Sequence, residues 1–475
     1  MDNSTKSKPK CKAMPNLAMS VLMLMTFGNL GTSMAFSLQS SQMSRIFQTI
    51  GADPTKLGFF FILPPLAGMV VQPLVGWFSD HTWIPKIGRR LPYLIVGSVV
   101  AMIVMFLLPN AGSFGFGFGS MAALWFGAIS ILFMDLMSNM SMQPFKMIIG
   151  DMVNDDQKDK AWAWQTIWSN IGSFAAYLFP FILSAFGVAN VAARGVVPAS
   201  VRYSFYLGAI ILGVTAFFTV FKVHEYDPAT YNEYHGIDPE VQKTEKTSVM
   251  DILKKAPKVF WTLGLVEFFS WVSFQYLWTY APGALSANIW HTTDATSAGF
   301  QAAGNWYGVL SAVQTVASIL YGYVLSHLND KTRKPFYSAG LVVAAVGFAM
   351  LSFCHTRWLS VIAFVFIGIG WVTINSIPFT ILTNALDGKH DGTYIGLFNC
   401  WICLPQICAS VASFALYPWF TRLSHGNGSS MMILFGAAFF IIGAFTVWIV
   451  KETKANNVQQ AVFDEKEAQQ LDTDE

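Results

Sequence analysis

One stretch of the chain, residues 131–151, places ionisable and amide side chains inside a long apolar segment. Asp135, Asn139 and Gln143 recur at every fourth residue, which brings their side chains to one face of a helix. A carboxylate at the centre of a bilayer costs roughly 2.5–3.5 kcal/mol on insertion scales, so such groups usually face a bundle interior or an aqueous cavity. The sequence therefore predicts a polar cavity beside Asp135.

A second acid, Glu267, falls in another apolar segment together with Trp271 and Gln275. These three positions share one helical face. Carboxylates and amides exchange hydrogen bonds with sugar hydroxyls, and aromatic side chains line most small-molecule sites. The set predicts a site for a neutral polyhydroxylated ligand. For Glu267 the alternative is a position near the cytoplasmic end of its helix, paired with a lysine of the neighbouring linker.

Further amides and tryptophans in apolar segments extend this candidate site. The remaining predicted ligand contacts are Trp168, Asn170, Asn375, Asn399 and Gln406. Amides also join membrane helices to one another, at about 0.6 kcal/mol each, and tryptophan is enriched at membrane interfaces. Helix packing or an interfacial position is therefore the alternative for each residue. We expect no Arg or Lys within the membrane to bind an anion, which disfavours an anionic substrate.

These residues require elements that cross a membrane, and the composition supplies them. Of 475 residues 54% are hydrophobic and 12% are charged, whereas soluble domains contain about 25% charged residues. Apolar runs of about 20 residues fit the thickness of a bilayer, and a helix satisfies its own backbone hydrogen bonds there. We predict an all-α membrane protein with twelve transmembrane helices, at about 16–39, 57–78, 92–109, 121–148, 161–186, 202–222, 258–281, 301–325, 336–354, 358–382, 394–419 and 430–450.

Basic residues are distributed unevenly over the connections between these runs. With the N-terminus placed inside, most of the 29 Lys and Arg residues fall on the inner side, and Arg45 is among the few outside. The positive-inside rule then predicts that both termini are cytoplasmic. We expect a plasma membrane, and the short loops favour a bacterial inner membrane. The basic residues determine topology, so no nucleic-acid partner is expected.

The chain repeats itself at about half its length. An acidic residue, a basic cluster and a Pro-aromatic pair occur within 80–93 and again within 330–337, and Pro144-Phe145 is echoed by Pro378-Phe379. Parallel six-helix repeats around a central site are a transporter architecture. We predict two pseudo-symmetric six-helix halves. They comprise residues 1–222 and 258–453, with a cytoplasmic linker at 223–257 and a disordered acidic tail at 454–475.

Charged residues of the repeated loop form a candidate cytoplasmic gate. Its members are Gly76, Asp80, Arg89, Arg90 and Asp151 in the first half, with Asp330 and Arg333 in the second. We expect ion pairs among them to stabilise the outward-facing state and to break during the transport cycle. A purely topogenic role is the alternative, above all for Arg90.

The order of these motifs resembles a known family. Asp80 followed by Gly88-Arg89-Arg90 is similar to the cytoplasmic signature of the major facilitator superfamily. The fourth-helix series from Asp135 through Pro144 to Asp151 is similar to that of plant sucrose carriers and their animal and bacterial relatives. Further similarities lie at Ser169-Asn170, Ser270-Trp271, Asn375 to Phe379, Gly396 to Asn399 and Pro405-Gln406. The resemblance implies a glycoside–pentoside–hexuronide:cation symporter of the sucrose/maltose-carrier type.

Together these observations predict a secondary active transporter, not an enzyme, that imports a neutral disaccharide such as sucrose or maltose with protons. Asp135 is the first candidate for the coupling group and Glu267 the second, because such a group must bind and release a proton away from bulk water. Sodium coupling, exchange, export and a sugar sensor that does not transport remain as alternatives. We expect a monomer without metal or cofactor.

Overall fold

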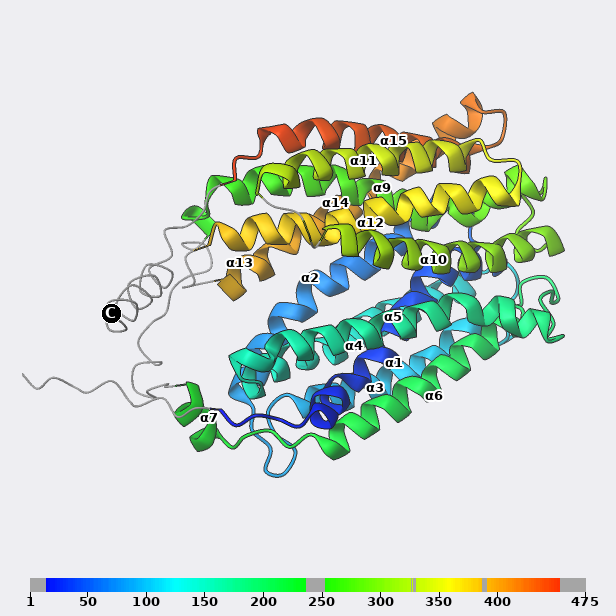
Figure 1. Ribbon diagram of the computed structural model, residues 1–475. Helices are drawn as coiled ribbons and strands as arrows, with labels where there is room; N and C mark the ends of the chain where they lie inside the picture. The colour runs from blue at the N-terminus through cyan, green and yellow to red at the C-terminus, as the bar shows by residue number, and fades with distance from the viewer. Residues whose placement is uncertain (1–13, 236–252, 326, 328–329, 387–390, 453–475) are drawn as a thin grey trace, which may run out of the picture.

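The computed structural model describes residues 14–235, 253–325, 327, 330–386 and 391–452. These residues form a bundle of long helices (Figure 1). In chain order the helices are α1 (Met19–Thr49), α2 (Leu57–His81), α3 (Leu91–Leu107), α4 (Met121–Met152), α5 (Asp155–Ala185), α6 (Ala199–Lys222), α7 (Pro228–His235), α9 (Lys258–Ile289), α10 (Ala298–Leu325), α11 (Asp330–Ser352), α12 (Arg357–Asn384), α13 (Asp391–Phe398), α14 (Cys400–Leu423) and α15 (Gly428–Thr446).

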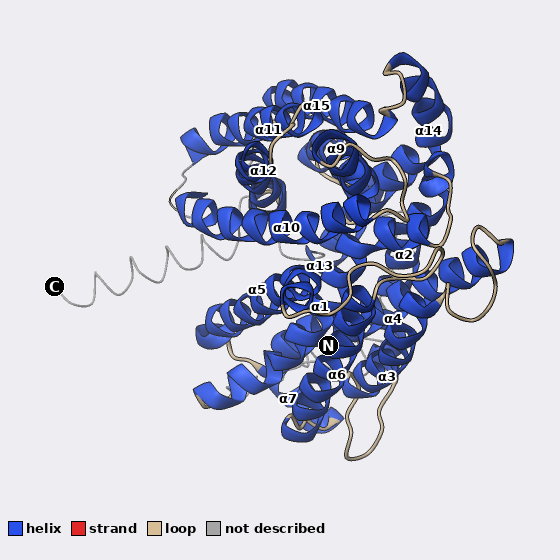
Figure 2. Ribbon diagram, turned by 90° about the vertical axis from the view of Figure 1, so that its right-hand side faces the viewer, coloured by secondary structure: helices blue, strands red, loops and turns tan. Residues whose placement is uncertain are grey.

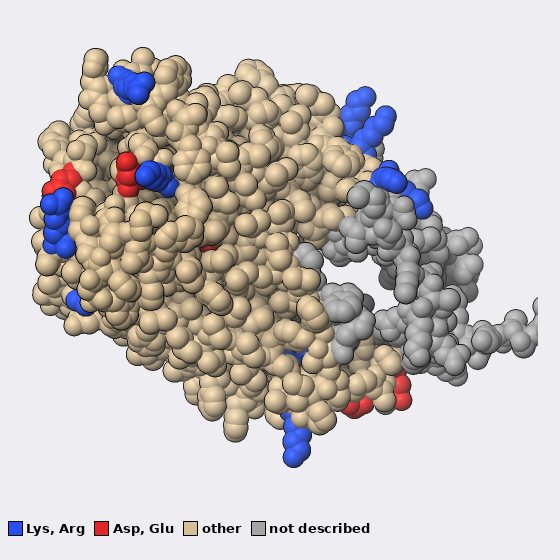
Figure 3. All heavy atoms as spheres, turned by 180° about the vertical axis from the view of Figure 1, so that it is seen from behind, with Lys and Arg blue, Asp and Glu red and all other residues tan. Residues whose placement is uncertain are grey.

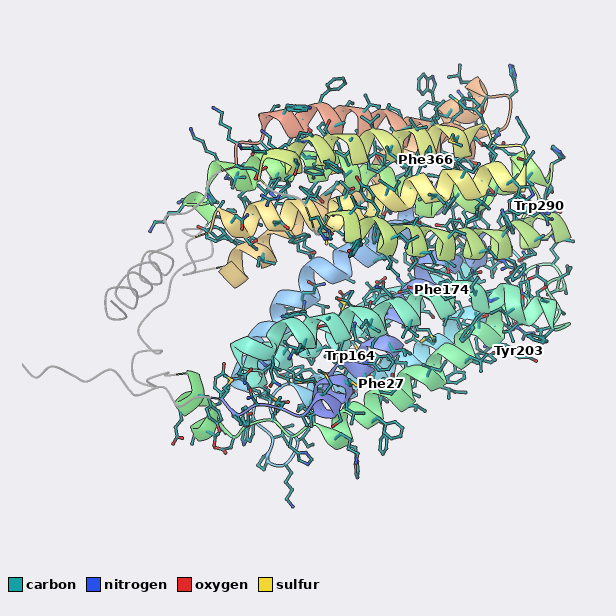
Figure 4. All side chains as sticks on the ribbon, in the orientation of Figure 1. Phe27, Trp164, Phe174, Tyr203, Trp290 and Phe366 are labelled. Atoms are coloured by element: carbon teal, nitrogen blue, oxygen red, sulfur yellow. The ribbon has the colours of Figure 1, made fainter. Side chains whose placement is uncertain are left out.

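The helices have the length and polarity of membrane spans. Within the described part of the chain, eleven segments are long and apolar enough to cross a membrane. The remaining predicted span, 258–281, falls on α9, a helix of 32 residues that is buried along most of its length. On the face shown in Figure 3, charged side chains gather at the two ends of the molecule and the band between them is almost free of charge.

The long helices form two groups that lie side by side (Figures 1 and 2). In the first half, α1 packs against α4, α5 and α6, and α3 packs against α4 and α6. In the second half, α9 packs against α15, α11 against α12 and α15, and α10 against α12. The two halves touch chiefly where α2 meets α14 and where α5 meets α10. The exact limits of the four predicted domains remain a prediction.

The two ends of the bundle differ in how closely the halves approach. The terminal end carries the start of α1, α7 and the end of α15, and the distal end carries the end of α1 and the start of α10 (Figure 1). Towards the distal end the halves interlock, since a Cβ on Gly308 would lie 2.3 Å from the backbone oxygen of Tyr177 and one on Gly58 would lie 2.3 Å from that of Ser410. Only glycine allows backbones to approach so closely.

The first helix is longer than the sequence predicts. The expected span ends at residue 39, whereas α1 continues to Thr49, and residues 41–49 are buried. Polar residues such as Gln42 and Ser44 end the apolar run, but other helices surround them, so they contact protein rather than lipid. Arg45 consequently lies inside the protein, and its expected place in an external loop is wrong.

Candidate functional site

A cavity of about 560 Å³ lies between the two halves. The first half lines it with α1, α2, α4 and α5, and the second half lines it with α9, α10, α12 and the start of α14. The described residues of α3, α6, α11 and α15 do not line the cavity; these helices pack behind the lining helices. Both halves therefore contribute corresponding helices to one central site, as the sequence repeat predicts.

Asp135 lies in the wall that the first half contributes. Its side chain is 3% exposed. The amide of Gln39 on α1 donates to the carboxylate at 2.5 Å. Asn139 donates to the backbone oxygen of Asp135 at 2.9 Å and accepts from the amide of Gln72 on α2 at 2.8 Å. Among the described residues that line the cavity, Asp135 is the single charged side chain.

Most of the predicted ligand contacts meet in this cavity. Those that line it are Asp135, Asn139, Asn170, Trp271, Gln275, Asn399 and Gln406. They lie on α4, α5 and α9, between α13 and α14, and on α14. The fold thus brings together segments that are far apart in the sequence. Gln275 also ties the halves, because its amide donates to the backbone oxygen of Phe61 at 3.1 Å and to the hydroxyl of Ser410 at 2.8 Å.

Three predicted contacts lie away from the cavity wall. Gln143 is eight residues from Asp135, which rotates its side chain by roughly 80° around a helix of 3.6 residues per turn, and neighbouring Met142 lines the cavity instead. The Trp168 indole donates to the backbone oxygen of Met23 at 3.2 Å. Asn375 is exposed, and its amide bonds the backbone of its own helix. Spacing along one helix did not reveal which face α5 or α12 turns inward.

Glu267 also lies outside the cavity lining, although it is completely buried. One carboxylate oxygen accepts from the indole N–H of Trp271 at 2.6 Å, and the other accepts from the hydroxyl of Tyr337 on α11 at 2.7 Å. In the part of the chain that the structure describes, the hydrogen-bond partners of Glu267 are therefore these two neutral donors, and not a lysine of the linker.

Three tryptophans are part of the wall that the second half contributes. Trp271 and Trp278 on α9 and Trp371 on α12 all line the cavity. The ring centroid of Trp371 lies 5.6 Å from that of Trp271 and 5.9 Å from that of Trp278, at steep interplanar angles. Phe274 packs edge-on against Trp371 at 5.0 Å. Among the described lining residues, the one acid belongs to the first half and the three indoles to the second, while amides line both walls.

Arg45 is a buried functional candidate that the sequence reasoning missed. Its guanidinium is 0% exposed and bonds four neutral amides. The acceptors are Gln301 at 2.7 Å and Asn305 at 2.7 Å in the second half, and Gln42 at 3.2 Å and Asn190 at 2.8 Å in the first. The helical spacing of Gln39, Gln42 and Arg45 beyond the apolar run was the available signal. Arg45 does not line the cavity, so the expectation that no basic side chain of the spans binds an anionic substrate stays a prediction.

Arg45 helps to hold the halves together towards the distal end. Gln301 also donates to the hydroxyl of Thr49 at 2.9 Å, and the hydroxyl of Ser44 donates to the backbone oxygen of Thr279 at 2.7 Å. In the described ranges, every side-chain hydrogen bond between the halves involves this network or Gln275.

The predicted gate residues lie at the terminal end. Arg89 and Arg90 form ion pairs with Asp151 at 2.8 and 2.9 Å, and Arg90 also donates to the hydroxyl of Ser79. The ring of Tyr231 lies 3.8 Å from the guanidinium of Arg89. Burial lowers the pKa of Arg89, but the ion pair with Asp151 outweighs it, and the pKa is raised above its usual range.

The second half has a smaller counterpart of this cluster, in which Arg333 pairs with Glu452 at 2.8 Å. Each of the ion pairs described here joins residues of the same half. For three further gate candidates, Gly76, Asp80 and Asp330, the surroundings fall outside what the structure describes. The latch between these charges remains a prediction.

The fold and the cavity can be compared with known proteins. The model of the Major Facilitator Superfamily matches residues 25–410. The chain belongs to this superfamily. It is therefore an integral membrane transporter and not an enzyme, as the sequence predicts. The all-α fold with two six-helix halves is confirmed with it.

Relatives within the superfamily include sucrose carriers. The chain is 22% identical to the sucrose transport protein SUC4 of Arabidopsis thaliana, over 87% of this chain and 86% of that protein. It is also 22% identical to the sucrose transport protein SUT3 of Oryza sativa subsp. indica, over 90% and 93%. The resemblance to the sucrose-carrier type is confirmed.

Solved structures of other transporters share the architecture. A D-xylose-proton symporter superimposes with a TM-score of 0.69 at 14% identity, covering 92% of this chain and 99% of that chain. The nucleoside transporter NupG superimposes with a TM-score of 0.66 at 13% identity, covering 91% and 100%. At these identities the likeness concerns the fold alone.

Proposed function

We propose that this superfamily member imports a neutral sugar, a disaccharide such as sucrose or maltose, together with protons. One observation carries the proposal: among the described residues that line the cavity, Asp135 is the single charged side chain, and the others are chiefly amides, hydroxyls, tryptophans and apolar groups. Such a lining can bind an uncharged polyhydroxylated molecule, and it offers one group that can carry a proton. The sucrose transport proteins among the relatives support the choice of substrate.

In this proposal the two walls bind different parts of the sugar. Asp135, Asn139 and Asn170 exchange hydrogen bonds with hydroxyl groups from the first half. Asn399 and Gln406 do so from the second half, where the three indoles cover the apolar face of the ring. An anionic substrate is disfavoured because no described residue of the lining is basic.

Alternating access follows from the way the halves meet. The distal end is closed by the Arg45 network, and the ion pairs of the terminal end join residues within one half. We infer an inward-facing state, with the terminal end in the cytoplasm and the segments 1–222 and 258–453 rocking against each other. The basic residues of the terminal loops support this orientation in a plasma membrane, with a bacterial inner membrane as the expected site.

Asp135 couples the proton to the sugar in this scheme. In the charged form its carboxylate accepts the amide of Gln39. A proton on Asp135 removes the charge from the cavity and turns the carboxyl into a hydrogen-bond donor for a sugar hydroxyl. Rocking of the halves then moves a neutral, loaded cavity, and loss of the proton to the cytoplasm weakens sugar binding.

Transport of labelled sucrose and maltose into proteoliposomes tests this function. An inward proton gradient should drive accumulation above the outside concentration, and a protonophore should abolish it. An imposed sodium gradient without a proton gradient should not drive uptake. Accumulation driven by sodium would show that sodium, and not the proton, is the coupling ion. Net efflux would indicate export. Saturable binding without any flux would instead identify a sensor, and the absence of both would refute the assignment to a sugar.

A further inference from the structure

We propose that Glu267 is a positioning residue, which fixes the indole of Trp271 in the cavity wall and thereby determines sugar affinity, without carrying the coupling proton. This inference rests on the proposed sugar transport for its kinetic consequence, although the orientation of the indole can be measured without any sugar. It separates the two buried acids by role, where the sequence alone assigns both to coupling.

Of the two described residues that hydrogen-bond Glu267, one lines the cavity. The carboxylate is 0% exposed and does not line the cavity, whereas Trp271, one turn further along α9, does line it. The 2.6 Å bond between the indole N–H and the carboxylate therefore joins the buried acid to the ligand-facing wall. A change at Glu267 must act on the ligand through this indole.

The chemistry of the partners matches a permanent acceptor. An indole N–H can only donate, and the hydroxyl of Tyr337 donates to the other carboxylate oxygen at 2.7 Å. A carboxylate satisfies both donors at once. In a protonated acid the carbonyl oxygen could still accept from the indole and the hydroxyl could donate to Tyr337, but both bonds would then be neutral. Hydrogen bonds to a charged acceptor are about twice as strong as neutral ones, so they hold the indole more firmly.

The orientation of Trp271 matters because its indole ring packs against the indole rings of Trp371 and Trp278. Trp271 contacts Trp371 edge-on at 5.6 Å and an interplanar angle of 74°, and its centroid lies 6.1 Å from that of Trp278. Rotation of the Trp271 ring would change the surface offered to the ligand and disturb both neighbours. The carboxylate behind the wall thus sets the shape of the apolar side of the cavity.

Access to Glu267 argues against a part in proton coupling. A coupling group must meet the aqueous space on each side of the membrane in turn. Asp135 lines the cavity, while Glu267 does not line it and is hydrogen-bonded to the indole of Trp271 and the hydroxyl of Tyr337. For a proton to pass from the cavity to Glu267, the indole of Trp271 would have to move. This movement would change the surface that binds the sugar.

The first experiment measures the indole directly, in full-length protein labelled with fluorotryptophan. The fluorine NMR line that is missing from Trp271→Phe belongs to Trp271. We expect that line to shift or broaden in Glu267→Gln, whose amide accepts only one of the two donors. Trp306→Phe is the matched control, since that indole donates to Ser360 at 3.0 Å away from the cavity. An unchanged Trp271 line in Glu267→Gln would overturn the positioning role, whatever the substrate is.

The second experiment measures labelled sucrose and maltose uptake by the same variants in proteoliposomes. Glu267→Gln and Trp271→Phe should each raise KM, by about tenfold for the loss of one charge-assisted hydrogen bond. The maximal rate, the number of protons per sugar and the pH profile should stay unchanged. The double variant should be no worse than Trp271→Phe alone, because both changes remove the same bond.

Other outcomes of the second experiment contradict the proposal. Loss of proton-driven accumulation in Glu267→Gln, with an unchanged KM, would make Glu267 a coupling group. Strictly additive increases in KM would show that it acts independently of Trp271. Should Glu267→Gln fail to fold, Trp271→Phe alone tests the proposal. An unchanged KM in Trp271→Phe would show that this indole does not contribute to sugar binding and would overturn the proposal. Failure of the wild type to move either sugar would refute the proposed substrate but leave the NMR result standing.

Discussion

Among the described residues, each half of this transporter buries one acid, and the two acids have different surroundings. Asp135 of the first half lines the cavity, whereas Glu267 of the second half is sealed behind Trp271. The correspondence of Pro144 and Pro378 places Ile369, not an acid, opposite Asp135. Duplication has thus kept the helix arrangement while the charge of the cavity belongs to one half only.

The partners of the two acids explain why only one of them suits proton exchange. Gln39 donates to Asp135 with its amide nitrogen, and its amide oxygen has no partner among the described residues. A flip of this amide would offer an acceptor to protonated Asp135, so the site can satisfy both forms of the acid. The indole beside Glu267 can only donate a hydrogen bond, and it binds the charged form of the acid more strongly than the neutral form.

The largest predicted effect comes from removing the charge of the first half. Asp135→Asn should abolish proton-driven accumulation, so that the inside-to-outside ratio of labelled sucrose falls to unity. Exchange of internal for external sugar should persist, because the amide still binds hydroxyl groups without releasing a proton. Accumulation and exchange are measured in the same proteoliposomes, with and without a proton gradient.

The matching change in the second half sharpens this comparison. Glu267→Gln neutralises the other buried acid, yet it should leave the accumulation ratio intact at saturating sugar. Equal loss of accumulation in both variants would mean that the halves share the coupling. Full accumulation by Asp135→Asn would remove the coupling role from the first half altogether.

A smaller effect is expected where the halves meet at the distal end. Asn305→Leu removes an acceptor that the second half offers to Arg45 across the boundary at 2.7 Å. A buried charged donor that loses its partner costs about 1.5–3 kcal/mol, which shifts the conformational equilibrium about 10- to 100-fold. The state open at the distal end should gain population. Its gain is measured as faster labelling of a cysteine at Thr279 in a background without the native cysteines.

The control for this variant removes an acceptor within one half. Asn190→Leu deletes the contact at 2.8 Å between Arg45 and the connection from α5 to α6. That contact does not cross the boundary, so the labelling rate should change much less. Equal effects of the two variants would show that the loss of any acceptor opens the end, and that the crossing contact has no special role.

The sequence predicts the helices, their order and much of the cavity, because hydropathy and helical spacing are local properties. Asp135, Asn139 and Trp271 are found at the site for this reason. Arg45 was missed because its burial depends on α10 and on the connection at Asn190, which are remote in the sequence. Gln143 was misplaced because a helix of 3.6 residues per turn drifts away from a spacing of four. The partners of Glu267 likewise depend on how α9 packs against α11.

The smallest effect concerns the terminal end, where the halves also differ. Beside the first half, Glu225 at the start of the predicted linker accepts the backbone N–H groups of Arg89, Arg90 and Leu91 and so caps the start of α3. Glu225→Gln should cost about 0.5–2 kcal/mol, as the loss of an N-cap does. The control in the second half is Glu452→Gln, which weakens one partly exposed ion pair and should cost about 0–1 kcal/mol. Thermal unfolding of the purified variants measures both.

The contribution of Glu225 to the stability of the folded protein should depend on pH. Burial raises the pKa of the Glu225 carboxyl above its usual 4.5, although the backbone N–H groups of Leu91, Arg89 and Arg90 act in the opposite direction. An acid whose pKa is raised by folding contributes stability that is fully present below 4.5 and is lost as the pH rises through the folded-state value. The stability advantage of the wild type over Glu225→Gln should therefore shrink as the pH rises from 4.5 towards neutrality. An advantage that grew over this interval would mean that the capping bonds, rather than burial, dominate at this end of the first half.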